Sequence, residues 1–169
     1  RGAQVYSAEG GMQVAHCPNV KLLPGDMQSF RPTYLVGVPR IFEKIFNGSQ
    51  QKAYEAGKAR IFDRATAVAI DYGQARWGGQ PSLWLKVQHA LFDRLVYSKL
   101  RAAMGGELRY AITGGASLGA RLGNFYAGIG LTVMEGYGLT ETTASGTFNR
   151  AEGPQIGSVG QPMPGTAVR

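Results

Sequence analysis

Leu108-Arg109-Tyr110-Ala111-Ile112-Thr113-Gly114-Gly115-Ala116-Ser117 opens the part of the chain that decides its fold. The first six residues are typical of a β-strand, and the two glycines after them predict a turn. Apolar residues then recur at helical spacing over residues 122–129, and residues 131–135 predict a second strand. A strand–helix–strand unit with short glycine-rich joints predicts an α/β fold, with a parallel sheet and flanking helices.

Working outward toward the N-terminus, the sequence predicts one more strand and a group of helices. Residues 33–38 form a nearly all-apolar run, which is typical of a strand that is buried on both faces. Residues 40–104 carry apolar stripes at the 3.6-residue helical period. The last of the predicted helices carries four apolar residues on one face: Trp84, Val87, Leu91 and Leu95. We expect a single partial domain over residues 1–169, with a helical region at about 40–104 and a βαβ region at about 107–169.

The composition is that of a folded domain. Hydrophobic residues make up 44% of the 169 residues, which is too large a share for a disordered chain. The single cysteine, Cys17, excludes an internal disulfide framework and favours a reducing compartment, so we expect a cytoplasmic protein. The sequence contains no run of 18 apolar residues and therefore predicts no membrane-spanning helix.

The positive charge is spread along the chain. Eighteen Lys and Arg residues against 11 Asp and Glu residues give a formal net charge of +7. Most of the basic residues fall at polar positions of the predicted helices, close to acidic residues, and no nucleic-acid-binding motif accompanies them. We therefore expect solvated helix faces and no nucleic-acid partner. Attraction to anionic lipid, with peripheral contact to a membrane, or to a polyanionic substrate stays open.

One glycine-rich turn allows a serine hydrolase. Residues 115–119 fit the pattern G-x-S-x-G and lie between a predicted strand and a predicted helix, as a nucleophile elbow does. In that fold the catalytic histidine follows the serine, whereas His16 and His89 both precede Ser117. Ser117 as a cap of the following helix is the simpler interpretation, and hydrolysis through Ser117 remains an alternative function.

The second glycine-rich turn carries groups that suit a nucleotide. Gly136 and Gly138 let the backbone approach a ligand closely, and Tyr137 offers a flat ring to a base. Thr140 offers a hydroxyl and a backbone N–H to a phosphate, while Glu141 is a hard oxygen ligand suited to Mg²⁺. Ligands of parallel sheets bind at the carboxyl ends of the strands, where this turn is expected. The chain has no G-x-x-x-x-G-K-[ST] loop, so it is not a P-loop NTPase.

Several segments together resemble the adenylate-forming superfamily of acyl-CoA synthetases, adenylation domains and luciferases. Tyr137-Gly138-Leu139-Thr140-Glu141 resembles a signature of that superfamily. Residues 113–118 look like its adenine-side Gly-Gly-Ala turn, and residues 156–165 look like the segment that follows the Thr-Glu motif. Residues 31–33 and 38–44 resemble the long-chain fatty-acid–CoA ligase branch. The resemblance implies a partial piece of the large N-terminal domain of an adenylate-forming enzyme.

The resemblance implies a two-step reaction for the complete protein. A fatty carboxylate attacks the α-phosphate of ATP to give an acyl-adenylate and pyrophosphate, and the CoA thiol then displaces AMP. ATP, fatty acid and CoA are thus the implied small-molecule partners, and Mg²⁺ is the implied metal cofactor. Another carboxylate-activating enzyme of the same superfamily is the alternative.

The resemblance also implies roles for particular residues. Thr140 would bind phosphate and Glu141 would hold Mg²⁺, which makes these two the catalytic candidates. Tyr137 would stack on adenine. The other nucleotide-binding candidates are Gly114, Gly115, Ala116, Gly136 and Gly138, of which Gly136 would also lie near the acyl carboxylate.

Three further parts of the superfamily have no counterpart in these 169 residues. They are a phosphate loop that ends in Pro-Lys-Gly, a Thr-Gly-Asp segment that holds the ribose, and a C-terminal domain with a catalytic lysine. We therefore expect an internal fragment that is inactive alone. Its oligomeric state is left open, because absent neighbouring strands leave sheet edges free to associate.

Overall fold

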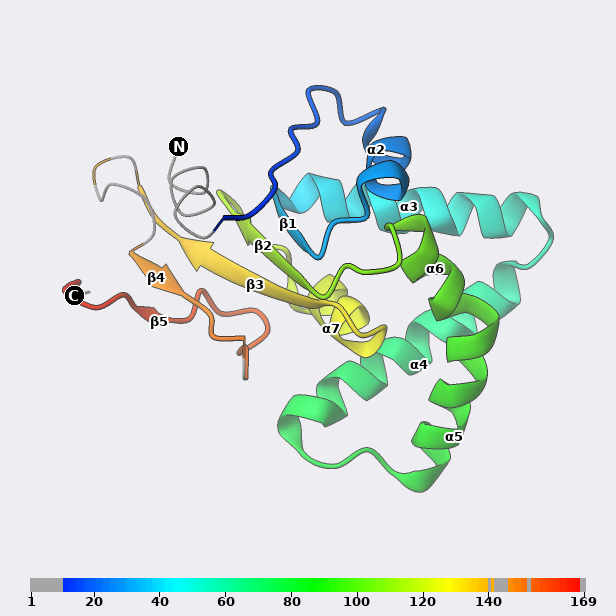
Figure 1. Cartoon of the computed structure of the whole chain (residues 1–169). Coiled ribbons are helices and arrows are strands. Elements are labelled where there is room, and N and C mark those ends of the chain that lie inside the picture. Colours follow the sequence, from blue (N-terminus) through cyan, green and yellow to red (C-terminus); the bar gives the residue numbers. More distant parts are fainter. Residues whose placement is uncertain (1–10, 140, 142–145, 152, 168–169) are drawn as a thin grey trace.

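The centre of the computed structural model is a mixed five-stranded sheet (Figure 1). The structure describes residues 11–139, 141, 146–151 and 153–167. In spatial order the strands are β1 (Tyr34–Gly37), β2 (Tyr110–Gly114), β3 (Thr132–Tyr137), β4 (Thr147–Phe148) and β5 (Gln161–Pro162). The first three strands run parallel, which confirms the expected parallel sheet. The last two extend it in antiparallel fashion, which the sequence did not predict because two-residue strands carry no periodicity.

Six helices and one π-helical turn connect and cover these strands in the described part of the chain. They are α2 (Leu23–Phe30), α3 (Pro39–Glu55), α4 (Ala59–Gly78), α5 (Leu83–Phe92), the π-helical turn η1 (Asp93–Tyr97), α6 (Ser98–Ala103) and α7 (Ala120–Gly128). Pro39 occupies the first turn of α3, where a missing N–H costs no hydrogen bond. The Ser82 hydroxyl accepts a hydrogen bond from the Leu85 N–H (3.2 Å) and caps α5.

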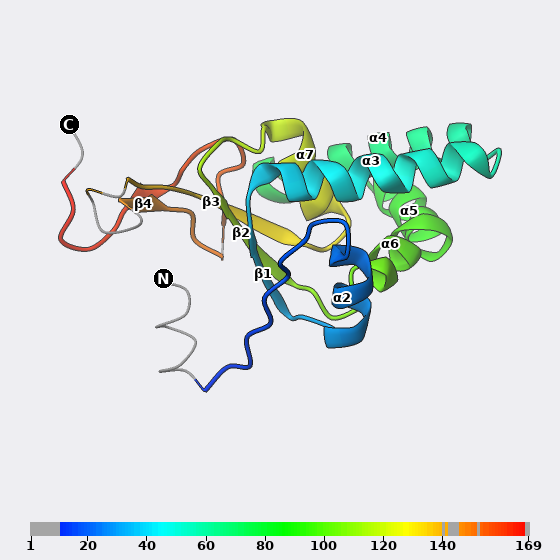
Figure 2. The ribbon, with the colours of Figure 1, turned by 90° about the horizontal axis from the view of Figure 1, so that it is seen from above.

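Helices α3, α4 and α7 lie on one face of the sheet, and α5 and α6 lie beyond its end (Figure 2). Helix α4 packs along α7 more extensively than any other pair of helices in the described structure. Two glycines allow this approach. A Cβ at Gly128 would collide with the Ala69 carbonyl oxygen, and one at Gly73 would collide with the Asn124 carbonyl oxygen. The two helices therefore meet backbone to backbone.

Aromatic side chains fill the space between these helices and the sheet. The Phe125 ring meets the Phe46 ring edge to face at 4.9 Å between centroids, and the Tyr126 ring meets the Phe42 ring at 5.6 Å. The Tyr126 hydroxyl donates to the Phe42 carbonyl (2.6 Å), and burial raises the pKa of this phenol. Tyr97 is anchored likewise, with its hydroxyl donating to a carbonyl of α4.

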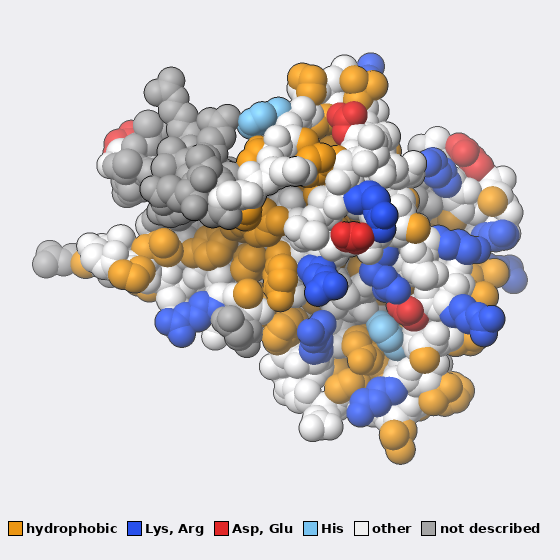
Figure 3. Space-filling model, viewed as in Figure 1, with side chains coloured by type: hydrophobic (Ala, Val, Ile, Leu, Met, Phe, Trp, Pro, Cys, Tyr) orange, Lys and Arg blue, Asp and Glu red, His pale blue; other side chains and the backbone are white. Residues whose placement is uncertain are grey.

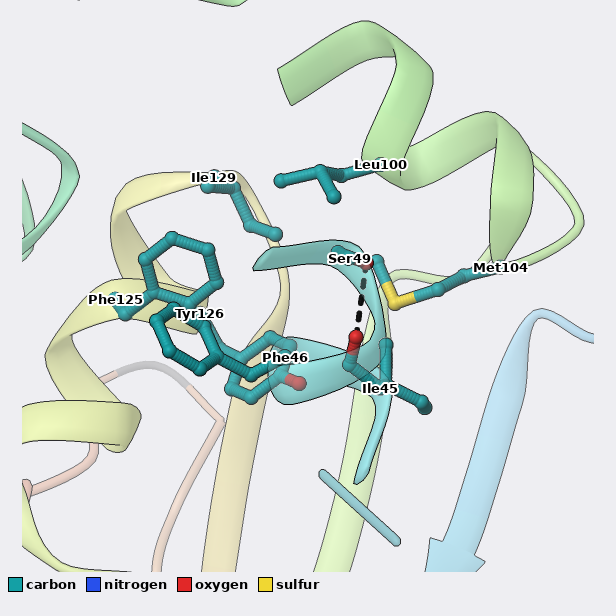
Figure 4. A pocket seen from close by; sticks show the side chains of 8 residues that line it. All are labelled: Ile45, Phe46, Ser49, Leu100, Met104, Phe125, Tyr126 and Ile129. Carbon is teal, nitrogen blue, oxygen red and sulfur yellow. Dashed lines mark hydrogen bonds between the residues drawn. The ribbon is translucent and has the colours of Figure 1, made fainter. Parts of the chain in front are cut away.

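The core contains one small gap, shown in Figure 4. Apolar side chains from α3, α6 and α7 line it, and the Ser49 hydroxyl donates to the Ile45 carbonyl (2.8 Å) beside it. Its volume is about 10 Å³, which is room for at most one water molecule. The gap is therefore a packing defect and not a ligand site.

The prediction that residues 33–38 form a strand with both faces buried is only half right. The strand exists, but the side chains on its outer face, Tyr34 and Val36, are exposed. The neighbouring Tyr110 of β2 is exposed on the same strip. An apolar run shows that both faces of a strand are suited to burial, whereas the described helices cover only one of them.

Among the described residues, no helix combines the length and the apolar character needed to cross a membrane.

Candidate active site

The two glycine-rich turns lie at one edge of the sheet because β2 and β3 are parallel neighbours. Gly114 at the end of β2 stands opposite Gly136 near the end of β3. A Cβ at Gly114 would lie 3.2 Å from the Gly136 carbonyl oxygen, and one at Gly136 would lie 2.8 Å from the Phe148 ring. The structure thus brings these two candidates together, and their lack of side chains lets β2 lie close to β3 and lets the Phe148 ring pack on the Gly136 backbone.

The turn after β2 is open to solvent. Gly115 has φ +83°, a conformation that favours glycine, and nothing lies within 4 Å of the position of its missing Cβ. Ala116 and Ser117, which follow it, are exposed. A ligand could therefore reach the backbone of this turn without displacing protein atoms.

Glu135 fixes this turn to β3. The side chain is 6% exposed, and its carboxylate accepts hydrogen bonds from the Leu118 N–H (3.1 Å) and the Ser117 hydroxyl (3.3 Å). From the sequence, Glu135 ends a predicted strand at the start of the nucleotide motif, and the pattern leaves its role open. An acidic residue inside an apolar strand was the available signal, because a buried carboxylate needs hydrogen-bond donors.

The surroundings of Ser117 favour a structural role. Its hydroxyl donates to Glu135 and accepts from the Gly119 N–H (3.2 Å), which tightens the entry to α7. The prediction that Ser117 caps α7 is wrong by two residues, because Gly119 is the N-cap and has no side-chain cap bond. His89 bonds the Gly128 carbonyl (2.6 Å) from α5, on the helical side of the molecule. A carboxylate is thus the acceptor that Ser117 contacts, and neither described contact of this hydroxyl supports the alternative of hydrolysis.

At the end of β3 the backbone is held by hydrogen bonds, and the side chains described there are exposed. The Tyr137 carbonyl accepts from the Gly146 N–H (2.8 Å), and Tyr137 pairs with Thr147 of β4. Its ring is nevertheless 53% exposed, and Gly138 is exposed beside it. Tyr137 thus offers the open ring face that base stacking requires.

The two catalytic candidates, Thr140 and Glu141, follow next in the sequence. Thr140 lies outside the described residues, so its predicted role stays a prediction. Glu141 lies in a turn with its side chain exposed to solvent. Among the described residues, no group of three or more His, Cys, Asp or Glu side chains gathers in a way that could hold a metal. A single carboxylate still fits Mg²⁺ in a nucleotide site, because that ion takes one or two protein carboxylates and completes its shell with phosphate and water.

Asn149 secures the segment that returns past β3, and the sequence analysis missed it. Its side chain is buried, donates to the Ser158 carbonyl (2.6 Å) and accepts from the Gln155 N–H (3.1 Å). Its backbone N–H donates to the Glu135 carbonyl (3.1 Å). The end of β3 pairs with β4, and β4 pairs with β5, so part of residues 156–165 lies one strand away from the end of β3. The three segments that resemble the adenylate-forming superfamily therefore share one region.

Comparison with known proteins decides which family this arrangement represents. Residues 2–169 match the family model described as AMP-binding enzyme. The chain belongs to the AMP-binding enzyme family. It is 49% identical over 169 residues to the long-chain-fatty-acid–CoA ligase FadD15 of Mycobacterium bovis, which covers all of this chain and 28% of that protein. It is 35% identical over 159 residues to long chain acyl-CoA synthetase 4 of Arabidopsis thaliana, which covers 89% of this chain and 22% of that protein.

Solved structures agree on the fold. The AMP-binding chain superposes on the crystal structure of the anthranilate CoA ligase AuaEII with a TM-score of 0.51 and 15% sequence identity, covering 90% of this chain and 21% of the other. The expected α/β fold is thereby confirmed. The family match confirms the expectation that the chain is part of an adenylate-forming enzyme. The chain spans just over a quarter of the length of FadD15, so the activity of the whole protein is a proposal.

Proposed function

We propose that the full-length protein containing this chain activates long-chain fatty acids, first to the acyl-adenylate and then to the acyl-CoA. The observation that carries the proposal is 49% identity, over the whole chain, to a protein named as a long-chain-fatty-acid–CoA ligase. Membership of the AMP-binding family accounts for the nucleotide half of that reaction. The open, glycine-rich turns at the ends of β2 and β3 support a nucleotide site at this edge of the sheet.

The adenine would lie between the two turns. Tyr137 has a pinned backbone and an exposed ring, so it stacks on the base with little loss of conformational freedom. Gly114, Gly115 and Ala116 line the other side, where the turn projects no large side chain. Glu135 holds that turn in place through the Leu118 N–H. These residues bind and orient the nucleotide.

The phosphates would lie beyond the end of β3. Gly136 and Gly138 keep side chains away from the path of the phosphates and the acyl carboxylate, and Thr140 contributes its hydroxyl and N–H as donors. Glu141 is the residue that would hold Mg²⁺. When bound, that ion neutralises the charge that develops on the phosphate oxygens. A carboxylate becomes a good acyl donor only once AMP is its leaving group. The main function of this edge of the sheet would therefore be to orient the α-phosphate.

The proposal includes the partners of the complete enzyme. Fatty acid, ATP and CoA are its substrates, and nucleic acid is not among them. We place the protein in the cytoplasm with peripheral contact to a membrane, where long-chain acids concentrate by the burial of their apolar chains. An isolated fragment that consists of residues 1–169 is expected to be inactive.

ATP–pyrophosphate exchange by the full-length protein tests the proposal. The acids to compare are octanoate, laurate, palmitate and stearate, with benzoate as a short aromatic acid and a reaction without acid as control. We expect exchange that depends on the acid and is fastest with the longer chains. Exchange with benzoate alone would transfer the assignment to another carboxylate-activating enzyme, and absence of exchange with every acid would overturn the proposal.

A further inference from the structure

Helix α5 and the turn after it expose an apolar stripe. Its members are Leu83, Trp84, Val87, Leu91 and Leu95, with exposed fractions of 81%, 69%, 61%, 57% and 47% in that order. Their spacing follows the helical period, so they form one continuous face, which we call the α5 stripe. No residue of α5 is buried. The face that the sequence identified as apolar therefore points away from the core, and none of the described elements covers it.

The opposite face of α5 is firmly attached, so the outward direction of the stripe is built in. His89 Nε2 donates to the Gly128 carbonyl (2.6 Å), and its ring stacks on Tyr72 at 3.8 Å between centroids. One turn later, the Arg101 guanidinium binds both carboxylate oxygens of Asp93 (2.7 and 3.1 Å). The same guanidinium donates to the Ile129 carbonyl (3.0 Å). These contacts bind α5, η1 and α6 to the end of α7.

Positive charge surrounds the stripe. Between residues 72 and 106 the only acidic residue is Asp93, and Arg101 neutralises it. Lys86 and Arg94 lie on the exposed side of the same helical stretch, Lys99 follows on α6, and none of the three forms an ion pair with a described residue. In Figure 3, orange and blue side chains intermingle over α5, at the lower right of the view, with little red among them.

This combination determines which partner fits. A second copy of the chain would bring the cations of one stripe against those of the other, which costs free energy. An anionic bilayer satisfies both features, because leucine and tryptophan side chains enter the interface while lysine and arginine reach the headgroups. We propose that the α5 stripe, with Lys86 and Arg94 beside it, binds the surface of an anionic membrane.

The position of the stripe is compatible with turnover at the membrane. Helix α5 lies at the end of the molecule opposite β4 and β5 in both ribbon views (Figures 1 and 2). The glycine-rich turns that follow β2 and β3 lie toward the β4 end. A membrane against α5 therefore leaves those turns open to water-soluble nucleotide.

Vesicle flotation of the full-length protein tests this surface directly. The vesicles are phosphatidylcholine alone, or phosphatidylcholine mixed with an equal amount of phosphatidylglycerol. We expect the native protein to float with the anionic vesicles and to bind the neutral ones at least about tenfold more weakly. Binding to the anionic vesicles should weaken as salt is raised.

Two double variants and two matched controls locate the binding surface. Trp84→Ser with Leu91→Ser removes the apolar anchor, and Lys86→Glu with Arg94→Glu reverses the charge; each pair should weaken binding by about tenfold or more. The controls are Ile61→Ser, which alters an exposed apolar residue of α4, and Lys44→Glu on α3, and both should bind as the native protein does.

This inference rests on the membrane contact of the proposed function, and its outcomes are separable from those of the exchange reaction. Unchanged vesicle binding in both double variants would overturn the inference, as would a native protein that binds neutral and anionic vesicles equally or binds neither. Each altered side chain is exposed in the described structure, so the variants should keep the native melting temperature and the native rate of ATP–pyrophosphate exchange measured without vesicles. A lower melting temperature for the variant with Trp84→Ser and Leu91→Ser would show that the rest of the full-length protein covers the stripe, and would overturn the inference. A protein without exchange activity that still floats through this stripe would contradict the proposed function alone.

Discussion

The α4–α7 interface and the glycine-rich edge of the sheet both depend on glycine, in opposite ways. At Gly73 and Gly128 a Cβ would strike the backbone of the facing helix, so glycine there allows close packing. At Gly115 nothing lies within 4 Å of a Cβ position, so glycine there keeps a turn open and permits its positive φ. The first region is built as a rigid support. The glycine-rich edge leaves the backbone of a turn open to a ligand.

The largest effect is expected on the reaction rate, at the glycine-rich edge of the sheet. Replacing Glu141 by alanine in the full-length protein should lower the rate of ATP–pyrophosphate exchange by about 10²-fold or more, because a charge stabiliser of the transition state is lost. The matched control is Glu43→Ala, which removes an exposed carboxylate from α3 and should leave the rate unchanged. An unchanged rate for Glu141→Ala at saturating Mg²⁺ would refute the metal assignment.

At the α4–α7 interface the expected effect is on the free energy of unfolding. Gly128→Ala should destabilise the protein by about 1–3 kcal/mol, because the new methyl group forces α7 away from α4. Gly48→Ala on α3 is the matched control, since nothing lies near its Cβ position, and it should stabilise by about 0.5–1 kcal/mol. Denaturant unfolding measures both changes. Equal stability of Gly128→Ala and the native protein would disprove the close approach of the two helices.

Glu135 combines features of both regions, because its buried carboxylate holds an exposed turn in place. Glu135→Ala removes the acceptor of the Leu118 N–H, so the KM for ATP in the exchange reaction should rise by about tenfold. Glu135→Gln retains an acceptor oxygen and should stay within about threefold of the native KM. If both variants behave alike, the carboxylate does not act through this hydrogen bond.

The smallest effect concerns the ion pair that fastens α6 to η1. The hydrogen bond from Arg101 lowers the pKa of Asp93, so the pair stabilises the folded state above the ordinary pKa of aspartate and loses that contribution as pH falls through the lowered value. Asp93→Asn should therefore cost about 0.5 kcal/mol at neutral pH, and less in acid. Thermal melts of both proteins at neutral and at acidic pH measure the difference. A cost that grows on acidification would contradict this sign.

The sequence predicted the regions whose signals are local. The strands β2 and β3 follow from β-type apolar runs, α7 follows from helical spacing, and the glycine turns follow from composition. It did not predict the roles of Glu135 and Asn149, because each acts through partners that only the fold brings near. For a related reason, the sequence did not predict that the α5 stripe faces solvent. Periodicity identifies an apolar face and does not say what covers it.

The central claim is that the exposed Tyr137 ring at the end of β3 receives the base of a nucleotide. Calorimetric titration of the full-length protein with a non-hydrolysable acyl-adenylate analogue tests it most directly. Tyr137→Ala should weaken binding by about tenfold or more, because stacking of a base on an aromatic ring contributes ~1–3 kcal/mol, while Tyr137→Phe should bind within about threefold of the native protein. Native affinity in Tyr137→Ala would contradict the placement of the nucleotide at this edge of the sheet.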